Sequence, residues 1–143
     1  MIRALLMSCA LLAPGLAQAA PAVTVQGAWF RYLLPQVPAG GFMTLVNHAN
    51  TDAVLTGAKS SACGSAMLHE STTKSGMDMM MTVNSVTIPA HGTFRFAPGG
   101  YHVMCMKPDM KVGSTATVQL LFRNAPPLDV TFRVYGADGK PGA

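Results

Sequence analysis

Short alternations of apolar and polar residues run through most of the chain. From 128 to 135 the even positions are Leu, Val, Phe and Val, while the odd positions carry Asp, Thr and Arg before the final Tyr135. This period of two buries one face of a β-strand and leaves the other wet. The segment 115–122 repeats the pattern with Val118, Leu120 and Phe122. No segment keeps a helical period over the ~10–12 residues that a helix needs.

Short β-rich segments separated by turn residues account for the rest of the chain. A Pro/Gly loop is expected at 35–41, a polar loop at 71–76 and tight turns at 89–92 and 98–100. About nine strands with such frequent turns predict an all-β fold, an antiparallel sandwich or small barrel. The β-rich segments behind this approximate count are 23–32, 42–47, 53–59, 66–70, 79–83, 85–88, 93–97, 101–106, 115–122 and 128–135.

Residues 1–19 have the layout of a Sec-type signal peptide. A single arginine, Arg3, precedes an apolar run, and Ala17-Gln18-Ala19 provides a small-x-small cleavage site. The apolar run is too short to span a bilayer, so we expect no stable membrane insertion. Cys9 lies inside this run and not at its end, which disfavours a lipoprotein. We expect export to the periplasm and one mature domain, residues 20–143.

Composition and charge narrow the function classes. Half of the residues are hydrophobic and 11% are charged, which is typical of a folded domain. The net charge of +4 comes from basic residues scattered singly along the chain, whereas a nucleic-acid surface needs a patch or stripe. His69-Glu70 lacks the second histidine of a zinc-protease helix. The sequence also shows no recognisable pairing of a catalytic nucleophile with a general base. We therefore expect neither nucleic-acid binding nor an enzyme.

Two cysteines, Cys63 and Cys105, remain after the leader. In an oxidising compartment such a pair is more often a disulfide than a pair of free thiols. A thiolate metal ligand is the competing interpretation. We favour the disulfide.

Methionine and histidine crowd into one stretch of the chain. Of the 11 methionines, eight lie between Met67 and Met110, together with three of the four histidines. Methionine is a flexible core filler, and Met43 fits that role. The segment 77–81 carries methionine on both faces of a short strand, which exceeds what packing explains. His48 and His91 lie in turn sequences and are expected to be exposed.

Strand alternation brings part of this stretch onto common faces. His102, Met104 and Met106 share one face of the segment 101–106, and Met67 and His69 share a face in the same way. Met80 would add a further donor, but Met79 and Met81 lie opposite it on a regular strand. The odd or even position of a residue in the sequence does not show which of these three methionines joins the histidines.

The donor types indicate the metal. Thioether sulfur is a soft, neutral ligand that favours Cu(I) over zinc. Neither methionine nor neutral imidazole is lost to disulfide formation outside the cell. Such a set suits a carrier of Cu(I) more than a redox catalyst, and its net charge of +1 is best tolerated near the surface.

The spacing of these residues resembles a known signature. His69, Met80, His102 and Met104 match the H-x10-M-x21-H-x-M pattern of periplasmic copper chaperones of the PCuAC type. The Ile88-Pro89-Ala90-x-Gly92 turn, the segment 98–104 and an early Gly27-Ala28-Trp29-x-Arg31 fit as well. The likeness covers nearly the whole mature chain.

This resemblance implies a cupredoxin-like Greek-key β-sandwich that binds one copper ion, as Cu(I), through His69, Met80, His102 and Met104. Binding of Cu(II) stays open. It also implies a monomer that delivers copper to acceptor proteins in the assembly of the binuclear centre of cytochrome c oxidase, in the periplasm of a gram-negative bacterium. Cys105 departs from the pattern and, with Cys63, suggests a disulfide that ties the ligand-bearing strands together. The remaining methionines of the stretch are alternate ligands or a docking surface: Met67, Met77, Met79, Met81 and Met106.

Two other classes compete with a copper chaperone. A cupredoxin-like electron carrier needs a His2Cys site with a weak axial methionine, but the order here is His102, Met104, Cys105. An envelope β-sandwich that binds no metal would use the methionines as an apolar patch.

Overall fold

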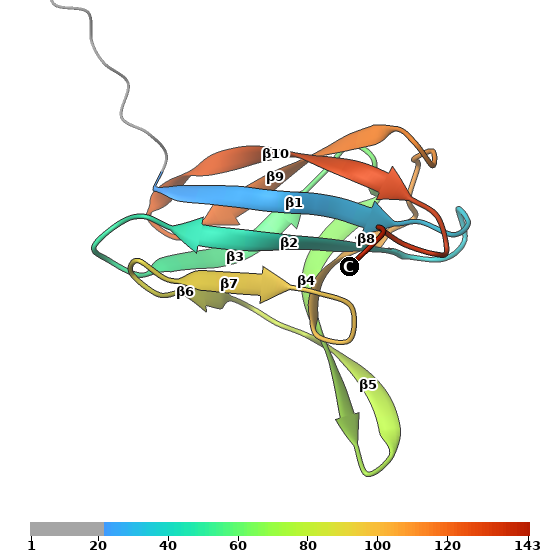
Figure 1. The fold of residues 1–143 in the computed structure, drawn as a ribbon, viewed down its shortest axis with the longest axis horizontal. Coiled ribbons are helices and arrows are strands. Elements are labelled where there is room, and N and C mark those ends of the chain that lie inside the picture. The colour runs from blue at the N-terminus through green and yellow to red at the C-terminus, as the bar shows by residue number, and fades with distance from the viewer. Residues whose placement is uncertain (1–21) are drawn as a thin grey trace, which may run out of the picture.

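The computed structural model describes residues 22–143, so the leader expected at 1–19, Cys9 included, lies outside the described residues. This part of the chain folds into one ten-stranded sheet and contains no helix (Figure 1). It therefore has no helix of the length and apolarity that crossing a membrane requires. The strands are β1 (Val23–Arg31), β2 (Ala39–Asn47), β3 (Ala53–Lys59), β4 (Ser65–Lys74), β5 (Met77–Thr82), β6 (Val86–Ile88), β7 (Thr93–Phe96), β8 (Tyr101–Met106), β9 (Thr115–Phe122) and β10 (Ala125–Tyr135).

The strands follow one another in the order β5-β4-β8-β2-β1-β10-β9-β3-β6, and β7 pairs with β2. The pairs are antiparallel except for one: β1 runs parallel to β10, with Trp29 opposite Arg133. The prediction of an all-β fold is confirmed, and the strands pair antiparallel as predicted except at this one pair. A parallel pair needs a long connection, and here that connection is nearly the whole domain.

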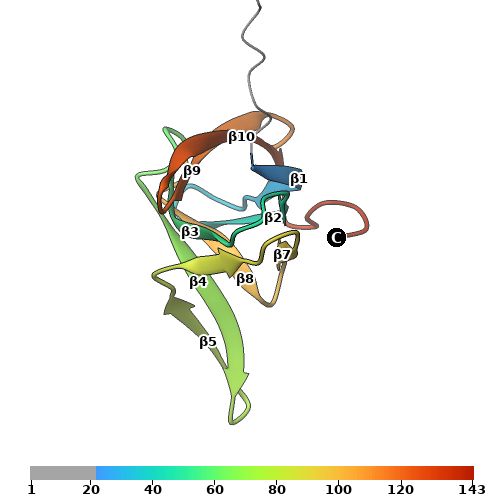
Figure 2. The same cartoon turned by 90° about the vertical axis from the view of Figure 1, so that its left-hand side faces the viewer.

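The sheet curls on itself and encloses the core (Figure 2). The inward side chains of most strands are completely buried, and Phe30 packs against Phe132 with ring centroids 4.8 Å apart. Other members of this core include Leu45, Leu55 and Phe96. The even positions of β10 toward its end, Phe132 and Val134, point inward as the alternation predicts.

Strand positions agree well with the sequence pattern where one face is apolar. The segments 53–59, 101–106 and 115–122 coincide with β3, β8 and β9. The expected loop at 35–41 is wrong at its end, because β2 begins at Ala39. Gly41 is there for close packing and not for a turn, since a Cβ at this position would lie 2.7 Å from the ring of Phe30.

The loop expected at 71–76 is also mostly strand. β4 continues to Lys74 and turns back through Ser75 and Gly76, both at positive φ, into β5. This is the backbone of a two-residue hairpin turn. The end of β4 and all of β5 form an arm that projects from the body of the domain (Figure 1). Solvent reaches both faces of that arm, so no apolar alternation marks it as strand.

Candidate metal centre

Two cross-strand pairs of β4 and β8 place four of the predicted donors together. His69 lies directly opposite His102, and Met67 directly opposite Met104. The intervening residues Leu68 and Val103 are buried in the core, so these two pairs of side chains, including the alternate donor Met67, share the face that is turned away from it. We call this the outer face. The centroids of the two imidazole rings are 5.7 Å apart.

Met80 joins the same face from β5. It lies opposite Ser71 of β4, and Thr82 lies opposite His69. The hydroxyl of Thr82 is 3.3 Å from Nε2 of His69, which shows that the even positions of β5 face the outer side. Met79 and Met81 face the other way. The register therefore selects Met80 among the three methionines that the sequence could not separate.

His102 is held in one orientation. Its side chain is 5% exposed, and Nδ1 lies 3.1 Å from the carbonyl oxygen of Gly100. Because a carbonyl oxygen only accepts hydrogen bonds, Nδ1 must carry the proton. Nε2 is then left with its lone pair, the arrangement found in many metal-binding histidines. The ring of Phe42, 6.3 Å away between centroids, supports the imidazole from the next strand.

His69 has an unused nitrogen. Its Nδ1 is buried and has no hydrogen-bond partner. Burial lowers the pKa of His69 below its ordinary value, and the neighbouring His102 lowers it further. Both effects favour the neutral imidazole, which is the form that binds a metal ion.

A pocket of about 190 Å³ opens beside these donors, and Met80, His102 and Met104 contribute to its wall. Gly40 lies opposite Met104 on β2, and Arg31 lies opposite Gly40 on β1. The glycine leaves room in this row for the ring of Phe42, which would lie 3.1 Å from a Cβ at this position. The guanidinium of Arg31 stacks over Trp29 and Phe42 at 5.5 and 5.9 Å. The remaining lining residues are Leu33, Pro38, Phe42, Ser71, Pro98 and Gly99.

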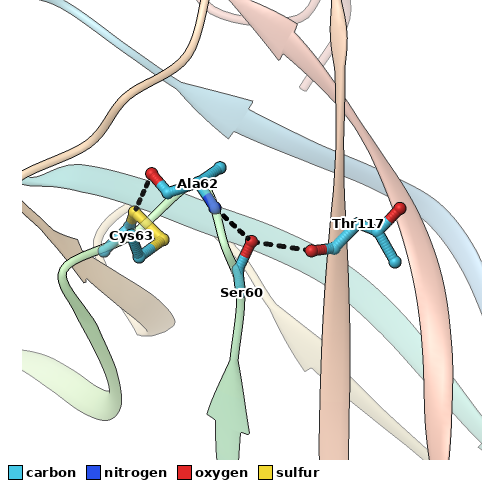
Figure 3. The surroundings of a disulfide bond; sticks show 5 residues. Ser60, Ala62, Cys63 and Thr117 are labelled. Atoms are coloured by element: carbon cyan, nitrogen blue, oxygen red, sulfur yellow. Dashed lines mark hydrogen bonds between the residues drawn. A yellow bond between two sulfur atoms is a disulfide. The ribbon is translucent and has the colours of Figure 1, made fainter.

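The structure joins Cys63 and Cys105 in a disulfide, with Cα atoms 5.3 Å apart. Cys105 is completely buried and points away from the outer face, and Cys63 lies in the loop just before β4. The link therefore ties β8 to the loop that leads into β4, behind the donors. Ser60 fixes the same loop, accepting from Ala62 N–H and donating to the carbonyl of Thr117 (Figure 3).

Other candidates lie elsewhere. Met106 shares the outer face of β8 but is opposite Ser65, two residue pairs beyond the pair of Met104 with Met67. His48 and His91 are exposed in turns, as the sequence predicts, and they hydrogen-bond to Thr24 and Asn50. No group of three or more histidine, cysteine or acidic residues within 22–143 could hold a metal ion.

Sequence reasoning did not find the residues that orient the donors. Thr82 and Phe42 act only through cross-strand proximity. Gly100 acts through its backbone carbonyl, two residues before His102, so its residue type does not indicate that role. Arg31 stood in the early Gly-Ala-Trp-x-Arg segment, but nothing in that segment placed it beside Met104.

The donors fit a soft monovalent ion. They supply imidazole nitrogen and thioether sulfur, all neutral, with one imidazole nitrogen buried and unpartnered. Thioethers select Cu(I) over harder divalent ions.

Comparison with solved structures defines the class of fold. The copper-bound PCuAC domain from PmoF2 superposes with a TM-score of 0.68 at 24% identity, covering 83% of this chain and 97% of that domain. The Cu(I) form of DR1885 from Deinococcus radiodurans is 36% identical, with a TM-score of 0.64, covering 83% of this chain and 81% of that one. Apo-DR1885 is 32% identical with a TM-score of 0.62, covering 98% and 99%. The chain has the fold of a PCuAC domain.

Sequence comparison then gives the family. Residues 23–134 match the family described as putative lipoprotein LpqE-like, and the chain belongs to it. A putative lipoprotein, Lxx21020, from Leifsonia xyli subsp. xyli is 36% identical over 124 residues, which cover 82% of this chain and 74% of that protein.

Proposed function

We propose that this protein is an exported copper chaperone that binds one Cu(I) ion through His69, Met80, His102 and Met104. It delivers the ion, as a monomer in the periplasm, to acceptor proteins that assemble copper enzymes, the binuclear centre of cytochrome c oxidase among them. The PCuAC fold and the likeness to the Cu(I) form of DR1885 support this proposal. The proposal also assigns the sheet to the cupredoxin-like Greek-key folds.

One observation carries the proposal. The hairpin of β4 and β5 and the strand β8, which comes later in the chain, bring imidazole and thioether donors to the same face. Packing does not require this arrangement, because the core lies on the opposite face. A soft ion is the ligand that these donors have in common.

The unequal burial of the donors suits transfer. His102 is buried and oriented, whereas Met80 is 64% exposed on the edge strand of the sheet. An acceptor can therefore displace the thioether of Met80 first while the imidazoles still hold the ion. Ligand exchange one donor at a time keeps the copper from being released to solvent.

The disulfide argues against an electron carrier. A blue-copper site needs a cysteine thiolate with two histidines. Cys63 and Cys105, the two cysteines of the described part of the chain, are bonded to each other. A copper-loaded protein without intense blue colour is the expected result.

The first test compares Met80→Ala with Met79→Ala. Both residues are exposed methionines of β5, but only Met80 faces the donors. We expect Met80→Ala to weaken Cu(I) binding at least tenfold, about 1.4 kcal/mol, and Met79→Ala to leave the highest-affinity site unchanged. Anaerobic titration against a Cu(I)-selective chelator measures both.

The second arm of the test uses the histidines. His102→Ala should weaken Cu(I) binding more than His91→Ala does. His91 is the matched control, because it is an exposed histidine in a turn. X-ray absorption of the protein loaded with one equivalent should count two sulfur and two nitrogen neighbours. Unchanged affinity in both Met80→Ala and His102→Ala would refute the assignment.

A further inference from the structure

Three methionines of β5 take no part in the centre described above. Met77, Met79 and Met81 occupy the odd positions of the strand, on the face opposite Met80, and are 67%, 43% and 54% exposed. They belong to the projecting arm (Figure 2) and not to the core. Packing therefore does not explain three large apolar side chains in one exposed row.

The row has the spacing of a chelate. Residues at i and i+2 of a strand stand about 6.6–6.8 Å apart on one face. The flexible side chain of methionine lets two such neighbours turn their sulfur atoms toward one ion. The ends of the row, Met77 and Met81, are about twice as far apart, so one ion takes an adjacent pair.

The strand beside the row decides which pair. Met81 lies opposite Glu70 of β4, Met79 opposite Thr72, and Met77 opposite Lys74. A bound monovalent cation is attracted to the carboxylate of Glu70 and repelled by the ammonium of Lys74. Charge therefore favours Met79 and Met81 over Met77 and Met79.

We propose that Met79 and Met81 form a second site for Cu(I), on the face of the arm opposite the four-donor centre and with Glu70 balancing its charge. Two thioethers select a soft monovalent ion and bind it more weakly than four donors do. Only the thickness of β5 separates this pair from Met80, and β5 is an edge strand. The second site is thus placed to collect copper that then moves around the strand edge to Met80.

Leucine substitutions separate sulfur chemistry from apolar area. Leucine keeps a hydrophobic side chain of similar volume but supplies no donor. Wild type should bind two equivalents of Cu(I) under anaerobic titration, the second at least about tenfold more weakly. The double variant Met79→Leu/Met81→Leu should bind only the first equivalent. Met77→Leu, the matched control, should keep both.

The chemical shift of the methionine methyl groups identifies the donors directly. With ¹³C-methyl methionine labelling, the second equivalent of Cu(I), or of Ag(I) as a redox-inert probe, should shift Met79 and Met81 and leave Met77 nearly unmoved. Glu70→Gln should weaken the second equivalent without changing the first. A single equivalent in wild type, or two equivalents in the double variant, would overturn the second site.

Failure of the second site can be told apart from failure of the proposed four-donor centre. Met80→Leu tests the four-donor centre, since it should weaken the first equivalent and spare the second. If the methionine row serves only as an apolar contact, wild type and the leucine double variant should each bind one equivalent of Cu(I). That result would also exclude the second site.

Discussion

His69 and His102 lie opposite each other, but their ring nitrogens have different surroundings. His102 is fixed through Gly100, while His69 keeps a buried nitrogen without a partner. The difference gives the apo-protein a measurable pH signature, because an imidazole that loses hydration and faces a second imidazole resists protonation.

We predict that His69 of the apo-protein titrates below the ordinary histidine pKa of about 6.5. The unfolded chain then binds more protons than the folded one between the lowered pKa and about 6.5, so stability falls as the pH falls through that window. NMR titration of the His69 ring protons gives the pKa. His102→Asn should raise it only in part, since burial is the larger cause. A pKa at or above 6.5 in wild type would contradict this prediction.

At the residue scale, the sequence alone could show which donor types are present but not the direction in which each side chain points. The resemblance to the family signature gave His69, Met80, His102 and Met104 as the expected ligands, and the structure places these four side chains on one side of β4, β5 and β8. Choosing Met80 over Met79 and Met81 by alternation alone required the register against β4, which depends on the turn at Ser75 and Gly76.

The arm of β4 and β5 is the element on which the proposed metal chemistry depends. β5 pairs only with β4, and all six of its residues are exposed. Such a hairpin opens easily, because few buried contacts hold it. Copper bound between Met80 and the donors of β8 would add a link from the arm to the body of the domain.

We therefore predict that one equivalent of Cu(I) slows amide exchange in β5. The expected slowing is about tenfold or more at the amides that bond to β4, since opening must then break a metal bond. Hydrogen–deuterium exchange of apo and loaded protein measures it, and β9, on the other side of the molecule, is the internal reference. Met80→Ala should abolish the effect, and equal slowing in that variant would mean that Met80 is not a ligand.

The sequence pattern failed at this element for a physical reason. Alternation reports a contrast between a buried face and a wet face, and the arm has no such contrast. Residues 71–74 therefore looked like a loop. β3, β8 and β9 were predicted at their correct bounds because each buries one face.

At the scale of the whole molecule, the disulfide closes a long loop. Cys63 and Cys105 are 42 residues apart, and the enclosed segment includes the arm and all four proposed donors. A crosslink over such a distance reduces the conformational entropy of the unfolded chain.

We predict that Cys63→Ser/Cys105→Ser lowers the free energy of unfolding by about 4 kcal/mol. Denaturant unfolding of the oxidised wild type and the double variant measures the difference. Cys63→Ala/Cys105→Ala, which leaves no hydroxyl in the buried position of Cys105, is the comparison that separates the crosslink from polarity. Stability equal to wild type in both variants would contradict the prediction.

The overall arrangement was the part least accessible from the sequence. Strand segments specify which faces are buried, but not which strands are neighbours. The parallel pairing of β1 with β10 joins residues such as Trp29 and Arg133 from opposite ends of the chain, and no local pattern encodes such a contact. Periodicity predicted an all-β sandwich or small barrel, and only the family resemblance added the expectation of a cupredoxin-like Greek key.

Along β8, Met104 faces outward while the next residue, Cys105, faces inward, so a single strand separates two kinds of sulfur. The sheet therefore keeps the proposed copper-binding surface apart from the covalent crosslink. A protein engineer could replace the crosslink with an apolar pair, or alter the outward donor side chains, as two independent design problems within one six-residue segment.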